Sequence, residues 1–326
     1  MIVVGVDAGG TSTKALAWDV STAAVVGTGR SGPGNPNSAG VDLARGHVLE
    51  AVLGCVGERV EEVGSVALTM AGGSATGGAL AGLDEAARAA GLKGAITVHP
   101  DQLGAWFSGT ASERGVVLIA GTGAVAATVV DGRIDALVDG AGWLLGDDGA
   151  GFWIGRRAVH DVLAAIDGRG PASALVDLVL ARTPQEARHR DRPGDPRRVA
   201  VIEHCYGLRP AQLAGFAPLV VQSAGDPVAD RILADAADLL VGTLDAALTR
   251  LGDSSGGAGD EAEVVLAGSI AGVDSVIRDR LVARLDGRAR YAGDGVIGAT
   301  LIALREAGLP ADDNVRAALV AASSGR

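Results

Sequence analysis

The chain has 326 residues, which suggests about two domains, and 28 Lys and Arg residues against 39 Asp and Glu residues give it a net charge of −11. Such an acidic chain is poorly suited to bind nucleic acid or an anionic membrane surface. Glycine accounts for 50 residues, yet there is no collagen repeat, and 48% of hydrophobic residues excludes a disordered chain. We therefore expect the glycines in the turns of a folded protein.

Cysteine usage and hydropathy exclude further classes. Cys55 and Cys205 have no partner at metal-ligand spacing, so zinc sites, iron–sulfur sites and a disulfide framework are not expected, and each cysteine is expected to pack as a small hydrophobe. No apolar run is long enough to span a membrane, and the residues up to Asp7 do not resemble a signal peptide. These observations predict a cytoplasmic protein.

The first part of the chain alternates strands, glycine turns and helices. In chain order, the pattern predicts strands at 2–6, 15–18 and 24–27, a helix at 43–63, a strand at 66–70, a helix at 78–90, a strand at 95–98 and a short helix at 102–109. The chain thus opens on the order strand, glycine turn, strand, turn, strand.

The same order recurs from residue 116. Strands are predicted at 116–119 and 125–130 around a second glycine turn, and Asp131-Gly132 is a two-residue hairpin signal. This internal repeat favours two related domains. The remaining pattern predicts helices at 152–165, 172–181, 210–223 and 227–251 (capped by Asp226), a strand at 263–266, a helix, a strand at 289–291 and two closing helices. Such alternation is typical of an α/β protein with largely parallel sheets.

Two common nucleotide motifs are excluded. Gly27-Thr-Gly-Arg-Ser-Gly32 fits the dinucleotide fingerprint, but Pro33 and Pro36 follow, so no helix can begin there to hold a pyrophosphate. Neither Lys14 nor Lys93 follows a glycine, which excludes the P-loop.

Three glycine turns at strand ends remain as candidate ligand loops. In the first, Gly9 and Gly10 leave backbone N–H groups open to an anion, Asp7 is placed to hold a hydrated Mg²⁺, and further donors are Thr11, Ser12 and Lys14. Taken alone, this turn is also compatible with an ordinary glycine-rich hairpin.

The second and third turns repeat the first in simpler form. Gly121-Thr-Gly123 joins two strands, and Gly268-Ser-Ile-Ala-Gly272 separates a strand from a helix, where backbone could approach a flat ligand. Taken together, the three turns predict a nucleotide held between two domains.

Three motifs therefore occur in a fixed order: Asp7-Ala-Gly-Gly-Thr11, Gly121-Thr-Gly123 and Leu266-Ala-Gly-Ser269. This order resembles the first phosphate, second phosphate and adenosine motifs of the superfamily of actin, the heat-shock ATPases and sugar kinases. Within it, the chain resembles the N-acetylglucosamine kinase branch, in the same broad family as the BadF-type activator ATPases of benzoyl-CoA reductase. Further matching segments are Gly32-Pro-Gly-Asn35, Met70-Ala-Gly-Gly73, Pro100-Asp101, Trp143-Leu-Leu-Gly-Asp-Asp-Gly-Ala-Gly-Phe-Trp-Ile154, Ala214-Gly-Phe216 and Gly225-Asp-Pro227.

The resemblance implies an α/β fold of two ribonuclease-H-like domains, the actin-like ATPase fold, with an interdomain cleft. The domains are expected at residues 1–113 and 114–326, with the last helix packing back on the first domain. It also implies the cofactors ATP and Mg²⁺, a small-molecule sugar as substrate and a homodimer.

The resemblance assigns roles residue by residue. Asp101 matches the catalytic base, although an isolated Pro-Asp is also a helix N-cap before Gln102. Asp7 is the metal ligand, and the ATP-binding residues are Gly9, Gly10, Thr11, Ser12, Lys14, Gly121, Thr122, Gly123, Gly268 and Ser269. The sugar-binding residues are Asn35, Gly72, Gly73, Asp101, Gly140 and Asp147.

The sequence departs from the branch at one position. The branch carries Gly-Gly-Trp-Gly before the Leu-Leu-Gly-Asp stretch, and its tryptophan lies against the amide-bearing side of the sugar. This chain has Ala141 there. We therefore expect an ATP-dependent kinase that phosphorylates a hydroxyl, the 6-OH, of N-acetylglucosamine or glucosamine. The alternatives are a kinase for another hexose, an ATPase activator of a partner reductase and a sugar-sensing regulator on the same fold.

Overall fold

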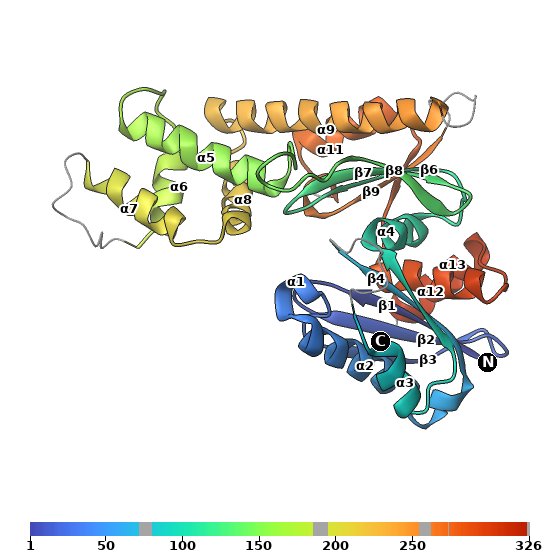
Figure 1. Cartoon of the computed structure of the whole chain (residues 1–326). Helices are drawn as coiled ribbons and strands as arrows, with labels where there is room; N and C mark the ends of the chain where they lie inside the picture. Colours follow the sequence, from blue (N-terminus) through green and yellow to red (C-terminus); the bar gives the residue numbers. More distant parts are fainter. Residues whose placement is uncertain (72–79, 185–194, 254–261, 273, 325–326) are drawn as a thin grey trace. The chain divides into compact units, whose positions relative to one another are not determined.

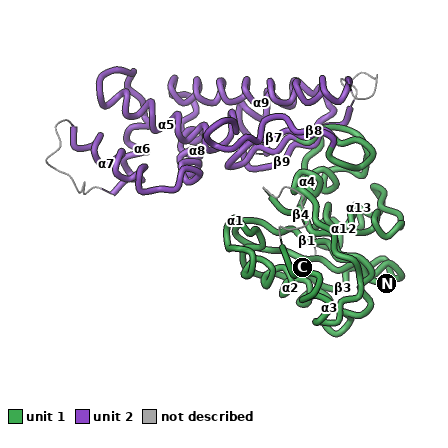
Figure 2. The backbone as a smooth tube through the Cα atoms, in the orientation of Figure 1, with its two compact units in different colours: residues 1–117, 129–134, 290–326 green, residues 118–128, 135–289 purple. Residues whose placement is uncertain are grey.

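The computed structural model describes residues 1–71, 80–184, 195–253, 262–272 and 274–324 (Figure 1). The chain divides into two compact units (Figure 2). Unit 1 consists of residues 1–117, 129–134 and 290–326, and unit 2 of residues 118–128 and 135–289. The C-terminal residues thus group with the N-terminal ones, and the expected boundary at residues 113 and 114 stays a prediction.

Unit 1 is built on a five-stranded sheet of order β3-β2-β1-β4-β5. Its strands are β1 (Ile2–Ala8), β2 (Thr13–Asp19), β3 (Ala24–Ser31), β4 (Val63–Met70) and β5 (Ala95–Pro100). Its helices are α1 (Pro36–Ala39), α2 (Val41–Val56), the 3₁₀ helix η1 (Gly57–Glu62), α3 (Leu83–Ala89), α4 (Asp101–Gly109), α12 (Gly295–Glu306) and α13 (Asp313–Ser324).

The first sheet is mixed, so the expectation of largely parallel sheets is wrong here. β2 pairs antiparallel with β1 and with β3, because short turns join these three strands. β4 pairs parallel with β1 and with β5, after connections that contain α2 and α3.

A second sheet has the order β10-β9-β6-β7-β8. When the strands of each sheet are numbered in chain order from its first strand, the two sheets have the same order, read from opposite edges. Its strands are β6 (Gly115–Ala120), β7 (Ala124–Val130), β8 (Arg133–Asp139), β9 (Glu263–Ala267) and β10 (Ala289–Tyr291). The expected internal repeat and the fold class of two α/β sheets are confirmed.

The helices of unit 2 follow the hairpin β7–β8. They are α5 (Gly151–Ile166), α6 (Leu175–Arg182), α7 (Pro196–Tyr206), the 3₁₀ helix η2 (Pro210–Phe216), α8 (Ala217–Gln222), α9 (Pro227–Asp253), α10 (Ser269–Gly272) and α11 (Val276–Leu285). α5 packs on η2 and α8, while α9 packs on α11 (Figure 1). No helix in the described part of the chain is long and apolar enough to cross a membrane.

Two local predictions have clear outcomes. The hairpin at Asp131-Gly132 is confirmed, and both residues have positive φ, +51° and +68°, as a two-residue turn of the primed kind requires. The helix expected over 43–63 is confirmed up to Val56 and is wrong beyond that residue. α2 ends at Val56 because Gly57 takes φ +56° and its N–H donates to Leu53 O, and η1 then leads into β4.

The central strand β1 is covered on both faces. Ile2, Val4 and Val6 are fully buried in a cluster with residues of α2, and the alternation of a strand turns Val3 and Gly5 to the opposite face. That face carries α12, which also packs on α4.

Glycines, which have no side chain, allow the backbone of α12 to approach β1 and α4 closely. A Cβ on Gly5 would lie 2.2 Å from Thr300 N of α12, and a Cβ on Gly298 of α12 would lie 1.9 Å from Gly104 O of α4. Backbone-to-backbone packing therefore fixes the position of α12 against both β1 and α4.

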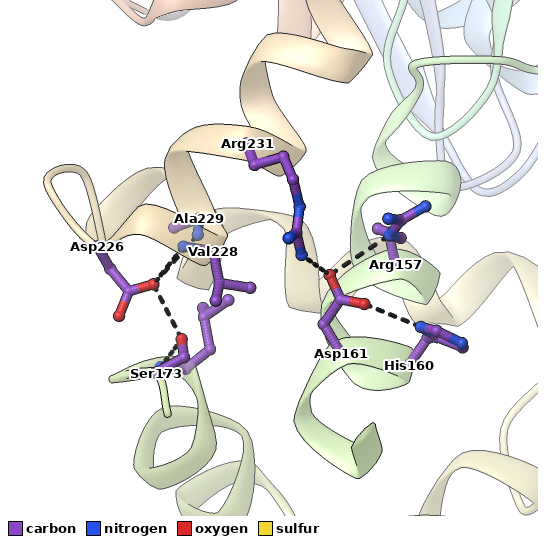
Figure 3. Close-up of polar contacts among 9 residues, drawn as sticks. Arg157, His160, Asp161, Ser173, Asp226, Val228, Ala229 and Arg231 are labelled. Carbon is purple, nitrogen blue, oxygen red and sulfur yellow. Dashed lines mark hydrogen bonds and ion pairs between the residues drawn. The ribbon is translucent and has the colours of Figure 1, made fainter. Parts of the chain in front are cut away.

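Two half-buried carboxylates connect the helices of unit 2 (Figure 3). Asp226 accepts from Ser173 Oγ at 3.0 Å and from the N–H groups of Val228 and Ala229 at 2.9 and 3.2 Å, which confirms it as the N-cap of α9. Asp161 of α5 pairs with Arg231 of α9 at 2.8 Å and with Arg157 at 3.4 Å. These contacts bind α5 and α6 to the start of α9.

The packing of α12 predicts opposite effects for two helical Gly→Ala substitutions. Gly298→Ala should destabilise the protein by about 2 kcal/mol, because the new methyl group collides with the backbone of α4. Gly242→Ala in α9 points into open space and should stabilise by about 0.5–1 kcal/mol through helix propensity. Thermal melting of both variants checks this, and a neutral or stabilising Gly298→Ala would contradict the account of the packing.

Candidate active site

Three carboxylates gather where β1, α4 and α12 meet in unit 1. Asp7 lies near the end of β1, Asp101 is the first residue of α4, and Asp294 is the N-cap of α12. Lys14 of β2, which pairs with Asp7 in the sheet register, places Nζ 2.8 Å from Asp294 Oδ2. Unit 1 thus combines acidic groups and a lysine at one end of its sheet.

Asp7 is in the most unusual environment of the three. Burial and the negative charge of Asp294 raise its pKa to about 6; Lys14 opposes this shift and Asp101 adds to it. A Cβ on Gly295 would lie 2.8 Å from Asp7 Oδ2, so the carboxylate occupies space that only glycine leaves free at the start of α12. The Asp7 carboxylate is therefore held where a neighbouring cation would favour its charged form.

Asp101 is half-buried. Burial raises the pKa of its carboxyl group, while hydrogen bonds from backbone N–H groups, that of Gln102 first among them, oppose the shift. The N-cap of α4 is Pro100 rather than Asp101, so Asp101 is not the capping residue that an isolated Pro-Asp would suggest.

The first glycine turn is closed by its own backbone. Gly9 N donates to Ser12 O at 3.0 Å, and Gly9 O accepts from the N–H groups of Gly34 and Asn35 at 3.2 and 3.3 Å. Gly10 and Thr11 are exposed and Ser12 is half-buried. The turn therefore contacts the segment of the candidate sugar ligand Asn35.

Asn35 is buried, and both ends of its amide have structural partners. Its Oδ1 accepts from Asn37 N at 2.9 Å as the N-cap of α1, and its Nδ2 donates to Ala71 O at 2.6 Å. An amide can make four hydrogen bonds, so capacity for a ligand remains. The candidate residues Gly72 and Gly73, which follow Ala71, lie outside the described residues.

The second glycine turn, 121–123, presents N–H groups on one side. The carbonyl oxygens of Gly121 and Thr122 accept from Gly151 N at 2.8 Å and Phe152 N at 3.0 Å, at the start of α5. Because C=O and N–H point in opposite directions in a planar trans peptide, the N–H groups of Thr122 and Gly123 point away from α5. Two adjacent N–H groups of this kind suit an anion.

The third glycine turn lies directly against the second. Gly268 has φ +90°, and a Cβ on it would lie 2.3 Å from Ala120 O and 3.0 Å from Gly121 N. Ser269 follows as the first residue of α10. Unit 2 therefore brings together the second and third glycine turns, which lie about 145 residues apart in the sequence.

A cavity of about 290 Å³ opens beside these two loops within unit 2. Its lining is mostly apolar, which suits a flat aromatic ring. The lining residues are Gly121, Thr122, Gly151, Ala214, Ala217, Pro218, Val221, Gln222, Ser269, Ile270, Ser275 and Ile277.

Asp147 and Gly140 both contact β7, next to the second phosphate loop. Asp147 Oδ1 accepts from Ala124 N at 3.1 Å, and Gly140 N donates to Ala124 O at 3.0 Å. Burial, and then the charges of Asp139 and Asp148, raise the pKa of Asp147, while the Ala124 N–H opposes the shift.

Sequence reasoning missed two residues of these sites. Asp294 pairs with Lys14, and Asp139 accepts from the backbone N–H groups of Asp147 and Asp148 at 2.8 and 2.9 Å. Asp294 carries a detectable signal, because an aspartate before a helical pattern is a typical N-cap. Asp139 carries none, because its partners are set by a loop conformation that no periodicity reveals.

Comparison with known proteins identifies the family. Residues 4–303 match the BadF/BadG/BcrA/BcrD ATPase family, so the chain belongs to it. Among curated relatives, the N-acetyl-D-glucosamine kinase of Dictyostelium discoideum is 30% identical over 267 residues, which cover 77% of this chain and 80% of that protein. Glucosamine kinase GspK of Vibrio cholerae is 28% identical, over 71% of this chain and 74% of its own.

Solved structures show the same fold. A Chromobacterium violaceum protein proposed to be an N-acetylglucosamine kinase has a TM-score of 0.71 at 23% identity and covers 92% of this chain and 98% of its own. The ROK hexokinase of Thermus thermophilus has a TM-score of 0.53 at 18% identity and covers 94% and 99%. The expected actin-like, sugar-kinase fold is confirmed.

The residues present fit the Mg²⁺ that such a kinase implies. Among the described residues, no three His, Cys, Asp or Glu side chains converge on a metal position. Mg²⁺ usually keeps several waters and takes one or two carboxylates together with substrate phosphates, and the half-buried Asp7 beside the first glycine turn suits that role.

The raised pKa of Asp7 predicts a pH-dependent effect of Asp7→Asn. Neutral Asp7 stabilises the folded protein fully below about pH 4, and this contribution is lost as the pH rises to about 6. Asn stays neutral, so the variant should match the wild type near pH 4 and exceed its stability by roughly 2 kcal/mol at pH 8.

Denaturant unfolding at the two pH values measures this difference. The exposed Glu85→Gln on α3 serves as the control and should show no such pH dependence. If the stability difference between Asp7→Asn and the wild type is the same at both pH values, the negative charge of Asp7 does not destabilise the folded protein.

Proposed function

We propose that the protein is an ATP-dependent amino-sugar kinase that transfers the γ-phosphoryl group to a hydroxyl, the 6-OH, of N-acetylglucosamine or glucosamine. The observation that carries the proposal is the half-buried carboxylate of Asp101 at the start of α4, whose charge acts on Asp7 beside the first glycine turn. The curated relatives, which are named as kinases of these sugars, support the same reaction.

Asp101 is the general base in this proposal. Its carboxylate accepts the proton of the sugar hydroxyl as that oxygen forms a bond to the γ-phosphorus, and the bond from γ-phosphorus to the β–γ bridging oxygen breaks to release ADP. Burial raises the pKa of Asp101 and so makes the carboxylate a stronger base than an exposed aspartate.

Each unit carries its own candidate nucleotide ligands in this proposal. Unit 2 supplies the apolar cavity for the adenine ring and the N–H groups of Thr122 and Gly123 for phosphate oxygens. Unit 1 supplies the first glycine turn, Lys14 and Asp7. Mg²⁺, when bound, neutralises charge on the phosphate oxygens.

The candidate sugar ligands are Asn35, Gly72 and Gly73 in the sequence of unit 1, and Asp147 and the backbone at Gly140 in unit 2. A carboxylate and an amide offer the mixed acceptors and donors that sugar hydroxyls require. Ala141 is exposed and brings no bulky wall against a substituent on the sugar nitrogen. This favours glucosamine as a substrate beside N-acetylglucosamine. The expected homodimer and cytoplasmic location stay predictions.

ADP release in a coupled assay tests the proposal. Glucosamine, N-acetylglucosamine and glucose are compared at saturating ATP and Mg²⁺. We expect at least one amino sugar to raise turnover at least tenfold above the ATP-only rate, and more than glucose does. No stimulation by any sugar would overturn the kinase assignment and favour the ATPase-activator alternative.

Asp101→Asn tests the base in the same assay. Removing a general base costs a factor of about 10²–10⁴ in kcat, while KM for ATP should stay within about twofold. Asp84→Asn, an exposed aspartate in the first turn of α3, is the matched control and should keep the wild-type rate. Near wild-type turnover of Asp101→Asn would remove Asp101 from the base role.

A further inference from the structure

Asp139, at the end of β8, arranges the loop that follows it. Its Oδ1 accepts from Asp147 N at 2.8 Å and its Oδ2 accepts from Asp148 N at 2.9 Å. One carboxylate thus binds two consecutive backbone N–H groups, eight and nine residues further along the chain. Hydrogen bonds to a charged acceptor are stronger than those between neutral groups.

The loop needs this support because its backbone is strained. Asp139 and Asp147 have φ of +60° and +57°, a region that side chains disfavour and that persists only where surrounding contacts impose it. Gly146 leaves the space for the carboxylate, because a Cβ there would collide with Asp139 Oδ1. The conformation of Asp147 therefore depends on Asp139.

Asp147 in turn contacts the second phosphate loop. Its Oδ1 accepts from Ala124 N at 3.1 Å, and its carboxylate lies against Gly123, where a Cβ would be 2.8 Å from Oδ2. A carboxylate can accept about four hydrogen bonds, so Asp147 can hold Ala124 N–H and still accept a sugar hydroxyl. The candidate sugar ligand is thus also a support of the loop 121–123.

From these contacts we propose that Asp139 is a positioning residue that holds Asp147 between the sugar and the second phosphate loop, so that sugar and nucleotide strengthen each other's binding. The proposal rests on the kinase function above. A sugar hydroxyl that donates to Asp147 fixes its carboxylate, and this fixes Ala124 N–H and the adjacent N–H groups of Thr122 and Gly123.

The proposal requires reciprocal coupling. If the sugar raises the affinity for the nucleotide by some factor, the nucleotide must raise the affinity for the sugar by the same factor. Couplings between sites in one protein are typically about 5- to 150-fold. Loss of Asp139 should remove the coupling without removing either binding surface.

Isothermal titration of the full-length protein with a non-hydrolysable ATP analogue and Mg²⁺ tests this. The titration is run with and without saturating amino sugar, either glucosamine or N-acetylglucosamine. The wild type should bind the analogue at least about fivefold more tightly with the sugar. In Asp139→Ala the gain should fall below about twofold, while the affinity measured without sugar stays within about twofold of the wild type.

Steady-state kinetics separate positioning from a general loss of structure. Asp139→Ala should raise KM for the sugar about tenfold or more, with a much smaller change in kcat. The reason is that the substitution weakens the contact between Asp147 and the sugar and leaves the general base Asp101 in place. Asp139→Asn keeps one acceptor oxygen for Asp147 N and should recover part of the coupling. Asp148→Ala removes a neighbouring, exposed carboxylate but keeps its backbone N–H, and should behave as the wild type.

Two outcomes overturn the proposal. The first is a wild type whose affinity for the analogue does not respond to a sugar that it phosphorylates, and this measurement needs no variant to fold. The second is Asp139→Ala that keeps both the coupling and the wild-type KM for the sugar. A wild type that phosphorylates no sugar is a different result, since it rejects the kinase function itself.

Discussion

The direct backbone contact of α12 with β1 and α4 determines where the acidic groups of unit 1 lie. Gly5 and Gly298 leave no side chain between these elements, so α12 packs on the strand and on the neighbouring helix at once. The start of α12, with Asp294, is therefore held near the end of β1, with Asp7, and the start of α4, with Asp101. The raised pKa of Asp7 follows from this packing.

In unit 2, a charged side chain rather than helix packing positions candidate site residues. Asp139 holds a strained loop through two backbone N–H groups, and Asp147 connects that loop to the second glycine turn. The same turn borders the third glycine turn at Gly268 and the apolar cavity. Within unit 2, the residues expected to contact sugar, phosphate and adenine are thus neighbours, and the proposed coupling between sugar and nucleotide rests on this arrangement.

Much of the fold could be predicted from the sequence because the signals are local. Asp131-Gly132 specifies its hairpin through two positive φ angles, Asp226 caps α9, and the repeated order of strand and glycine turn appears as two sheets of the same strand order. Gly57 shows the limit: its positive φ ends a helix that hydrophobic periodicity would continue. Asp139 could not be found, since its partners depend on tertiary loop geometry. Gly5, Gly104 and Gly298 lie in a strand and two helices, where they allow close packing instead of forming turns. Composition alone does not separate these uses.

The central claim is that the γ-phosphoryl group of ATP is transferred to a sugar hydroxyl rather than to water. Phosphorus NMR of the complete reaction with glucosamine and N-acetylglucosamine measures this directly, because it identifies every phosphorus-containing product. The account predicts that ADP and a sugar phosphomonoester form in equal amounts, with the phosphorus coupled to the protons of the sugar C6 methylene. Formation of ADP with inorganic phosphate alone, at the same rate with and without sugar, would contradict it.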